Sequence, residues 1–254
     1  MSRGWCFFFF SNCQYCCLMK PGLRRLRGLI IHRSAVREKD RIIEAFTREE
    51  GRVSFFAPGV RHVASKRAGH LETLMETQFV LAQTSKGNSL SEARVLKTFS
   101  QLRTDYDRLA IIYDIITTLR YYTNEGQGDA ALYDAVLSCM TVADKNTEVP
   151  NFLREIVAVQ LLRFLGALPD LYSCTRCRKR LKAGDFSLQS NVRGFWCSAC
   201  GGRKDAALTD VLKIVRIFLI GGENAFKLRV SEDNLRRLRL LTQGLLRGQG
   251  GVAK

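Results

Sequence analysis

Four short segments in the first hundred residues carry the apolar pattern of β-strands. In each of them apolar residues run together or alternate with polar ones, and the segments are Leu29–Ile31, Arg41–Thr47, Arg52–Ala57 and Glu72–Gln83. Turn signals separate them, at Gly51 after two glutamates and at Pro58-Gly59. Strands at this spacing, with no long helical pattern between them, predict a small closed barrel rather than a parallel sheet.

The next segment, Ser89–Leu96, fits two patterns. Ser89 followed three residues later by Glu92 is a capping box, which would open a helix. The same segment also alternates between two faces, with Leu90 and Leu96 on one of them, in the manner of a last barrel strand. The sequence leaves both interpretations open.

Beyond this segment the apolar period changes to three and four residues, which predicts amphipathic helices. The first helix is marked by Leu102, Tyr106, Leu109, Tyr113, Ile116 and Leu119. Further helical segments are 130–142, 151–165, 206–220 and 234–246, and Gly166 with Pro169 ends the second of these. The pattern predicts an α+β fold, with a β unit over residues 19–97, a helical unit over 98–254 and a cysteine-bearing insertion at 172–203.

Charge is the sharpest feature of the composition. The 254 residues include 40 Lys and Arg against 24 Asp and Glu, a formal net charge of +16, and the predicted β unit holds 16 against 8. An excess of this size favours a polyanionic partner, with nucleic acid first and an anionic membrane surface second. No run of 18 apolar residues occurs, which excludes a membrane-spanning helix.

Residues 1–18 contain four of the nine cysteines, at positions 6, 13, 16 and 17. The apolar run Trp5–Phe10 is too short for a secretory signal, and no small-residue cleavage site follows it. A metal site here remains an alternative, although the adjacent Cys16 and Cys17 suit no common ligand spacing. We expect an unstructured extension, with Met19 as the alternative start of the chain. The odd number of cysteines, spread over a long chain, fits a reducing compartment.

Four later cysteines form two CxxC pairs, Cys174/Cys177 and Cys197/Cys200. Each pair can lie on a tight turn that directs two thiolates at one ion, and 19 residues between the pairs leave room for a short hairpin. This is the spacing of a zinc ribbon. Because four thiolates fill the coordination shell, the predicted zinc is structural and has no open position for catalysis. Free cysteines or a redox pair are the minor alternatives.

Motifs for catalysis are missing. The chain has no GxxxxGK[ST] or GxGxxG loop and no GxSxG elbow, and its three histidines are scattered. We therefore expect a protein that is not an enzyme. A zinc-ribbon module that binds RNA or a transcription or translation complex is the alternative to a DNA-binding protein. An enzyme whose catalytic residues meet only in the folded chain is a third hypothesis, which no residue here supports.

The order of several segments resembles the RecO family of bacterial recombination mediators. The resemblance runs through Gly28–Ile31, Glu38–Ile43, Phe46-Thr47, Gly51–Ser54 and Ala57–Arg61, then through Tyr113 and Phe164–Pro169 into Cys174. It begins just past Met19 and covers the chain to its last predicted helix.

The resemblance implies an N-terminal OB-fold barrel and a helical domain with a four-cysteine zinc module. It implies a cytoplasmic, nucleoid-associated protein that binds single- and double-stranded DNA and anneals complementary strands without nucleotide hydrolysis. It further implies binding to the acidic, hydrophobic tail of the single-strand-binding protein SSB, and joint action with RecR in loading RecA.

Basic residues on the predicted barrel and near the cysteines are the candidate DNA contacts, because backbone neutralisation needs cations rather than a particular base sequence. They are Arg37, Lys39, Arg41, Arg52, Arg61, Lys66, Arg67, Arg176 and Arg178. The neighbouring pair Phe55-Phe56 would add aromatic rings, although at least one of the two is expected in the core.

Overall fold

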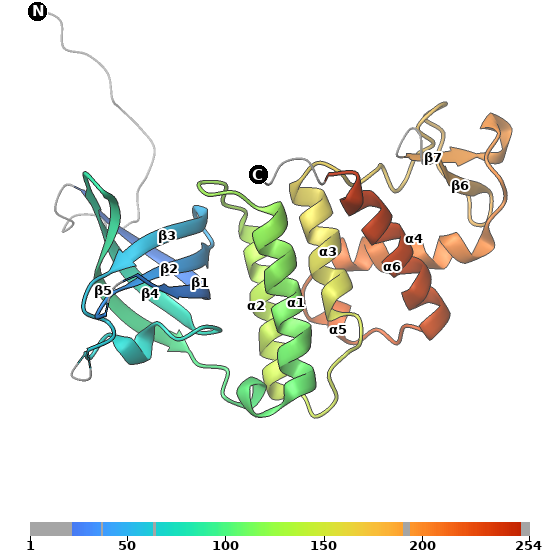
Figure 1. The fold of residues 1–254 in the computed structure, drawn as a ribbon. Coiled ribbons are helices and arrows are strands. Elements are labelled where there is room, and N and C mark those ends of the chain that lie inside the picture. Colours follow the sequence, from blue (N-terminus) through green and yellow to red (C-terminus); the bar gives the residue numbers. More distant parts are fainter. Residues whose placement is uncertain (1–21, 37, 63–64, 190–193, 250–254) are drawn as a thin grey trace, which may run out of the picture.

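The computed structural model describes residues 22–36, 38–62, 65–189 and 194–249. The expected extension at 1–18, with its four cysteines, lies outside the described residues, and so does Arg37. Figure 1 shows an elongated arrangement, with a β-barrel at one end, a helical domain in the middle and a small cysteine-bearing hairpin at the far end.

The first domain is a closed five-stranded barrel with strand order β1-β2-β3-β5-β4. Its strands are β1 (Leu23–Ala35), β2 (Arg41–Thr47), β3 (Gly51–Ala57), β4 (Glu76–Thr84) and β5 (Gly87–Lys97). The ambiguous segment Ser89–Leu96 is strand β5, which pairs with β4 along its length and touches β3 in parallel at Phe56–Ser89. Closure of the barrel needs this fifth strand, and this requirement outweighs the local capping-box signal. The predicted α+β fold class, an OB-like barrel followed by a helical domain, is confirmed.

Side chains of β3 alternate strictly between the barrel interior and the outer face. Val53, Phe55 and Ala57 are buried, whereas Phe56 points to the other face and is half-buried. The Phe55 ring packs against the Phe79 ring of β4, with 4.9 Å between their centroids. One phenylalanine of the adjacent pair is therefore a core residue, as expected.

The second domain is built on helices α1 (Tyr106–Tyr122), α2 (Ala130–Lys145), α3 (Leu153–Phe164), α4 (Ala206–Ile220), α5 (Glu223–Phe226) and α6 (Glu232–Arg247). Two short 3₁₀ turns, Ala68–His70 and Gln101–Thr104, lie in the connections before them. Side-chain caps fix the starts of α1, α2, α4 and α6, for example Asp129, which accepts from the Leu132 amide. Gly166, with a φ of 64°, ends α3. Within the described residues, no helix is both long enough and apolar enough to cross a bilayer.

The buried face of α1 agrees with the predicted one at Ile116 and Leu119 and differs from it at the two tyrosines. Ile112, Ile115, Ile116 and Leu119 enter the core, whereas Tyr106 and Tyr113 are 84% and 47% exposed. Tyrosine satisfies the same periodicity as leucine in a sequence pattern, but its hydroxyl favours water. Ile112 and Ile115, which the pattern did not mark, take inward positions instead.

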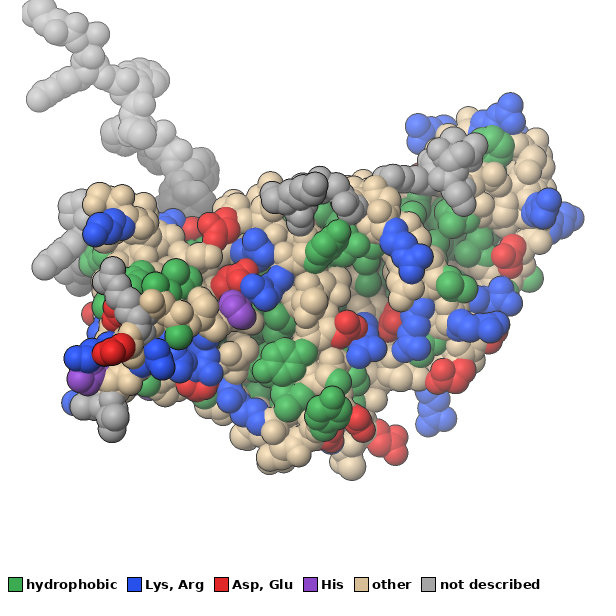
Figure 2. Space-filling model, in the orientation of Figure 1, with side chains coloured by type: hydrophobic (Ala, Val, Ile, Leu, Met, Phe, Trp, Pro, Cys, Tyr) green, Lys and Arg blue, Asp and Glu red, His purple; other side chains and the backbone are tan. Residues whose placement is uncertain are grey.

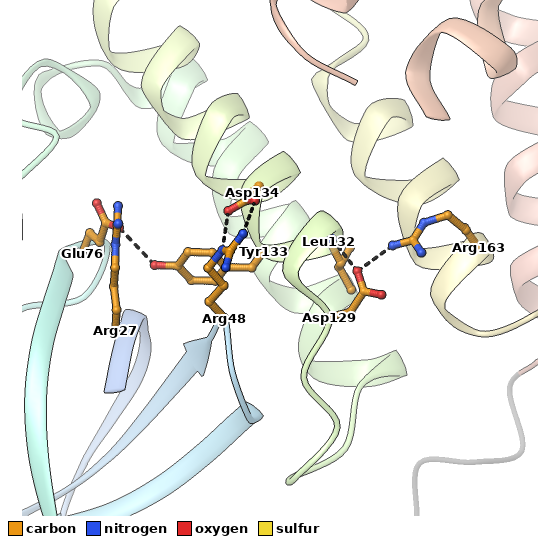
Figure 3. Close-up of polar contacts among 8 residues, drawn as sticks. All are labelled: Arg27, Arg48, Glu76, Asp129, Leu132, Tyr133, Asp134 and Arg163. Atoms are coloured by element: carbon orange, nitrogen blue, oxygen red, sulfur yellow. Dashed lines mark hydrogen bonds and ion pairs between the residues drawn. The ribbon is translucent and has the colours of Figure 1, made fainter. Parts of the chain in front are cut away.

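A buried polar contact joins the barrel to the helices (Figure 3). The Glu76 carboxylate on β4 is fully buried, accepts from Arg27 Nε at 2.5 Å, and accepts from the Tyr133 hydroxyl of α2 at 3.1 Å. Burial and the nearby carboxylate both raise the pKa of Tyr133, so its hydroxyl stays protonated and donates. An exposed ion pair, Arg48–Asp134, crosses the same boundary.

Close backbone packing between the β2–β3 turn and the α1–α2 loop also holds the barrel against the helical domain. Gly51 in the β2–β3 turn has a φ of 66°, and a Cβ there would lie 2.2 Å from the Gln127 carbonyl oxygen. Only a residue without a side chain allows the turn to approach the α1–α2 loop this closely. The barrel is thereby held against the helical domain at its β2–β3 end, which leaves the opposite end accessible.

Candidate metal centre and basic surfaces

The four CxxC cysteines come together in the segment between α3 and α4. We call residues 172–203 the cysteine module, which contains the hairpin of β6 (Phe186–Gln189) and β7 (Gly194–Cys197) and the 3₁₀ turn Ser198–Cys200. The four Sγ atoms lie within 4.8 Å of one another, and Cys177 Sγ is 3.7 Å from Cys197 Sγ. A tetrahedron with Zn–S bonds of about 2.3 Å has edges of about 3.8 Å. The donor set and its spacing therefore fit a tetrahedral thiolate-bound metal such as zinc.

Two similar turns present the thiols. Arg178, directly after Cys177, has a φ of 62°, and Gly201, directly after Cys200, has a φ of 94°. The Arg178 amide donates to the Cys174 carbonyl at 2.8 Å, and the Gly202 amide donates to the Cys197 carbonyl at 3.0 Å. Both pairs thus use a left-handed residue to complete the turn that aims two sulfurs at one point.

The surroundings of the Cys174 thiol favour its deprotonated, negatively charged form. Burial acts to raise the pKa of Cys174, but amides of Cys177, Cys197 and Arg176 directed at its sulfur outweigh this and lower the pKa to about 6. The pKa of Cys200 is raised to about 12, first through its contact with the Cys177 thiol. A divalent cation would stabilise all four thiolates together.

The ninth cysteine, Cys139, is separate from this cluster. It is fully buried in α2, where burial raises the pKa of its thiol and the Sγ lies 3.6 Å from the Leu153 carbonyl. It behaves as a small core residue.

Of the candidate DNA contacts on the barrel, three are exposed and close to one another in the fold. Lys39 lies in the β1–β2 loop, and Arg61 and Lys66 lie in the loop that follows β3. The Arg61 amide donates to the Lys39 carbonyl at 3.0 Å, which holds the two loops together. Arg41, at the start of β2, is half-buried beside them. These residues form the barrel-end basic surface, at the end of the barrel opposite the β2–β3 turn.

Arg52 and Arg67 are engaged inside the protein. Arg52 Nη1 lies 3.3 Å from the Glu44 carboxylate and donates to the Arg120 carbonyl of α1 at 2.6 Å. Arg67 Nη2 donates to the Pro58 carbonyl at 3.1 Å. Sequence patterns do not distinguish such guanidinium groups from exposed ones, because only the fold brings these partners within hydrogen-bonding distance.

In the cysteine module, Arg176 and Arg178 are both exposed. Arg176 Nη1 donates to the Cys200 carbonyl at 3.2 Å, and its Cζ lies 5.3 Å from the centroid of the Trp196 ring. Figure 2 shows Lys and Arg side chains over the barrel and over the cysteine module, with others on the helical domain between them.

A cavity between α1, α3 and α6 has a volume of about 240 Å³. Apolar groups of Ile115, Val157, Ala158 and Leu246 line it beside Arg154 and Arg239. Arg154 pairs with Asp114 at 2.8 Å, and Arg239 pairs with Glu155 at the same distance. No sequence pattern identified these lining residues, since they come from three separate helices.

Comparison with known families assigns the whole described fold. The family described as "Recombination protein O N terminal" matches residues 19–99, and "Recombination protein O C terminal" matches residues 103–253. The chain belongs to the RecO family. The resemblance noted from the sequence is thereby confirmed, and the family is one of recombination and DNA repair proteins.

Curated relatives agree over most of their length. The chain is 24% identical over 234 residues to the DNA repair protein RecO of Dehalococcoides mccartyi strain BAV1, covering 91% of this chain and 92% of the relative. It is 25% identical over 201 residues to the DNA repair protein RecO of Listeria monocytogenes strain HCC23, covering 78% of each.

Proposed function

We propose that this RecO-family protein is a DNA-binding recombination mediator, not an enzyme, that anneals complementary single strands without nucleotide hydrolysis. With RecR it helps to load RecA on SSB-coated DNA in the bacterial cytoplasm, at the nucleoid. The observation that carries the proposal is the match of both family models to a strongly basic chain, which has exposed cations at the barrel end and on the cysteine module.

The barrel-end basic surface is the proposed main DNA contact. Two strands that approach each other repel, so an annealing protein must neutralise both backbones. Exposed Lys39, Arg61 and Lys66, with Arg41 beside them, supply charge without base preference, and Arg37 is a further candidate two positions before Lys39 in the sequence. Arg176 and Arg178 supply it at the cysteine module. Arg67, which donates to the Pro58 carbonyl, would help to hold the loop after β3 in place. Arg52, bonded to Glu44 and to the Arg120 carbonyl near the β2–β3 turn, instead holds the barrel against α1.

The cysteine module is proposed to hold one structural zinc ion through Cys174, Cys177, Cys197 and Cys200. The ion would fix the two turns and the hairpin as one rigid unit. With all four positions taken by thiolates, it would supply stability and no Lewis-acid chemistry.

The cavity between α1, α3 and α6 is the proposed site for the SSB tail. Its apolar lining suits the hydrophobic side chains of such a tail, and the guanidinium groups of Arg154 and Arg239 suit its carboxylates. Both guanidinium groups already face a carboxylate of the protein, so the tail would share them rather than find them unpaired.

A substitution at Ala158 tests this site. Ala158→Glu places a carboxylate in the cavity, and we expect it to weaken binding of an SSB tail peptide at least tenfold while DNA binding is unchanged. Fluorescence anisotropy of a labelled peptide measures the effect. Unchanged peptide affinity, in a variant with the native circular dichroism spectrum, would place the tail elsewhere.

Annealing of complementary oligonucleotides, without ATP, tests the proposed function against its alternative. We expect salt-sensitive acceleration with DNA strands. If the protein instead accelerates only RNA pairing, or binds RNA and not DNA, the zinc-ribbon RNA-binding hypothesis replaces the mediator.

A further inference from the structure

Trp196 occupies an unusual position in the cysteine module. Its neighbour Phe195 is fully buried and packs edge-on against Phe186, at 5.9 Å between centroids, on the inner face of the β6–β7 hairpin. Alternation along β7 therefore places Trp196 on the outer face, opposite Ser187 in the strand register. The side chain is only half-buried, and it does not belong to the hydrophobic core of the helical domain.

The guanidinium group of Arg176 packs against the Trp196 ring. The Arg176 guanidinium stands over the Trp196 indole, with its Cζ 5.3 Å from the ring centroid, and donates to the Cys200 carbonyl. Arg176 is located between the two cysteines of one turn, and Trp196 directly precedes the first cysteine of the other. The turns that bring the thiols together therefore also hold the ring and the guanidinium in a fixed stack.

The surroundings of this stack are almost entirely cationic. Residues 172–203 contain seven Lys or Arg and a single acidic residue, Asp185. Six of these cations lie among the described residues, and all six are exposed: Arg176, Arg178, Lys179, Arg180, Lys182 and Arg203. None of the six forms a salt bridge with another described residue.

An aromatic ring among exposed cations is the combination that single-strand binding proteins use, with charge for the backbone and a ring for a base. Resting on the function proposed above, we infer that Trp196 and Arg176 form a base-stacking site for single-stranded DNA on the cysteine module. The site lies at the end of the molecule opposite the barrel (Figure 1), so it is a second contact with its own chemistry. The barrel end holds phosphates, and the module takes an unpaired base.

The tryptophan content offers a direct test. The chain has two tryptophans, Trp5 and Trp196, so a Trp5→Phe variant carries Trp196 as its single tryptophan. Titration with a thymidine oligonucleotide is expected to quench its emission, since stacking on a base quenches indole fluorescence. An oligonucleotide of equal length without bases should bind more weakly and leave the emission nearly unchanged. Equal quenching by both strands would mean that Trp196 senses charge alone, and would overturn the inference.

Affinity provides the second readout. Trp196→Leu is expected to weaken single-strand binding about 5- to 150-fold, the range for losing one base–aromatic stack, with Trp196→Phe restoring most of it. The slope of affinity against salt should not change, because every cation that meets a phosphate is still present. Tyr106→Leu is the matched control, since Tyr106 is an exposed aromatic residue flanked by Asp105 and Asp107. Metal content of the Trp196→Leu protein, measured by atomic absorption, shows whether the module remains folded.

The outcomes separate this inference from the function on which it rests. DNA binding with quenching and a Trp196-dependent affinity supports both. DNA binding without quenching, and unchanged in Trp196→Leu, overturns the stacking site and leaves the mediator proposal standing. Absence of DNA binding by the metal-loaded protein contradicts both, and quenching by an acidic peptide instead of DNA would assign the module to a protein partner.

Discussion

At the residue scale, a few buried polar contacts determine how the two domains meet. Glu76 has no exposure, and its carboxylate depends on Arg27 and on Tyr133 for compensation. Its second oxygen, Oε2, accepts no hydrogen bond from the described residues, and Lys97 Nζ lies 4.0 Å from it. A buried carboxylate that loses a donor costs more than an exposed ion pair that loses a partner.

Tyr133→Phe tests this contact. Removal of the hydroxyl deprives the buried Glu76 carboxylate of a donor, and we expect the free energy of unfolding to fall by about 2 kcal/mol. Arg48→Ala, which breaks the exposed Arg48–Asp134 pair at the same boundary, should change it little. Urea denaturation followed by circular dichroism measures both variants. An equal loss of unfolding free energy in the two variants would show that the buried Glu76 contact is not what stabilises the contact between the barrel and the helices.

At the element scale, we expect the folding of the cysteine module to depend on its four clustered thiols. Its hairpin has four residues in each strand, and such a hairpin is marginal in water without a further constraint. The two turns carry left-handed residues, Arg178 and Gly201, of which only glycine adopts that conformation without cost. A bound metal would supply the missing stabilisation.

Cys174→Ser tests this dependence, with Cys139→Ser as control. Cys174→Ser should lose the single metal ion per chain and increase proteolysis within residues 172–203, while the barrel stays protected. Cys139→Ser keeps the metal, because that thiol is buried in α2 far along the chain from the quartet. Metal analysis and limited proteolysis measure both effects. One metal per chain in Cys174→Ser would remove this residue from the ligand set.

Sequence patterns predicted these elements where a local signal sufficed. The predicted 206–220 segment coincides with α4, because its apolar period is uninterrupted and Gly221 ends it. Spacing alone identified the cysteine quartet that the fold brings together. Local patterns failed where distant residues decide. Ser89–Leu96 is a strand because β4 lies beside it, and α1 buries its isoleucines rather than Tyr106 and Tyr113.

For the candidate DNA contacts on the barrel, the sequence likewise could not show which basic side chains bond inside the protein. Lys39, Arg61 and Lys66 are exposed as expected, but Arg52 and Arg67 use their guanidinium groups on internal carbonyls and Glu44. Trp196 went unnoticed because a lone aromatic residue in a short strand has the signature of a core position. Its outward orientation depends on the register of the β6–β7 hairpin.

At the scale of the whole molecule, the exposed candidate DNA contacts lie on two separated parts, the barrel-end basic surface and the cysteine module. We expect the double variant Arg61→Ala, Lys66→Ala to bind single-stranded DNA more weakly. The slope of log K against log salt should become shallower by about 1.4, because each phosphate that is no longer neutralised accounts for about 0.7. Lys213→Ala with Arg236→Ala removes the same charge from helices α4 and α6, away from the barrel, and should leave the slope nearly unchanged. Fluorescence anisotropy over a salt series measures both. Parallel slopes for the two double variants would exclude Arg61 and Lys66 from the site.

The central claim is that one basic chain both neutralises DNA backbones and acts on SSB-covered strands. The most direct measurement is annealing of two complementary oligonucleotides, one coated with SSB, without ATP, at low and at moderate salt. We predict acceleration that persists on the coated strand, weakens as salt rises and is lost with an SSB that lacks its acidic tail. A folded, metal-loaded protein that accelerates neither naked nor coated strands would contradict the account.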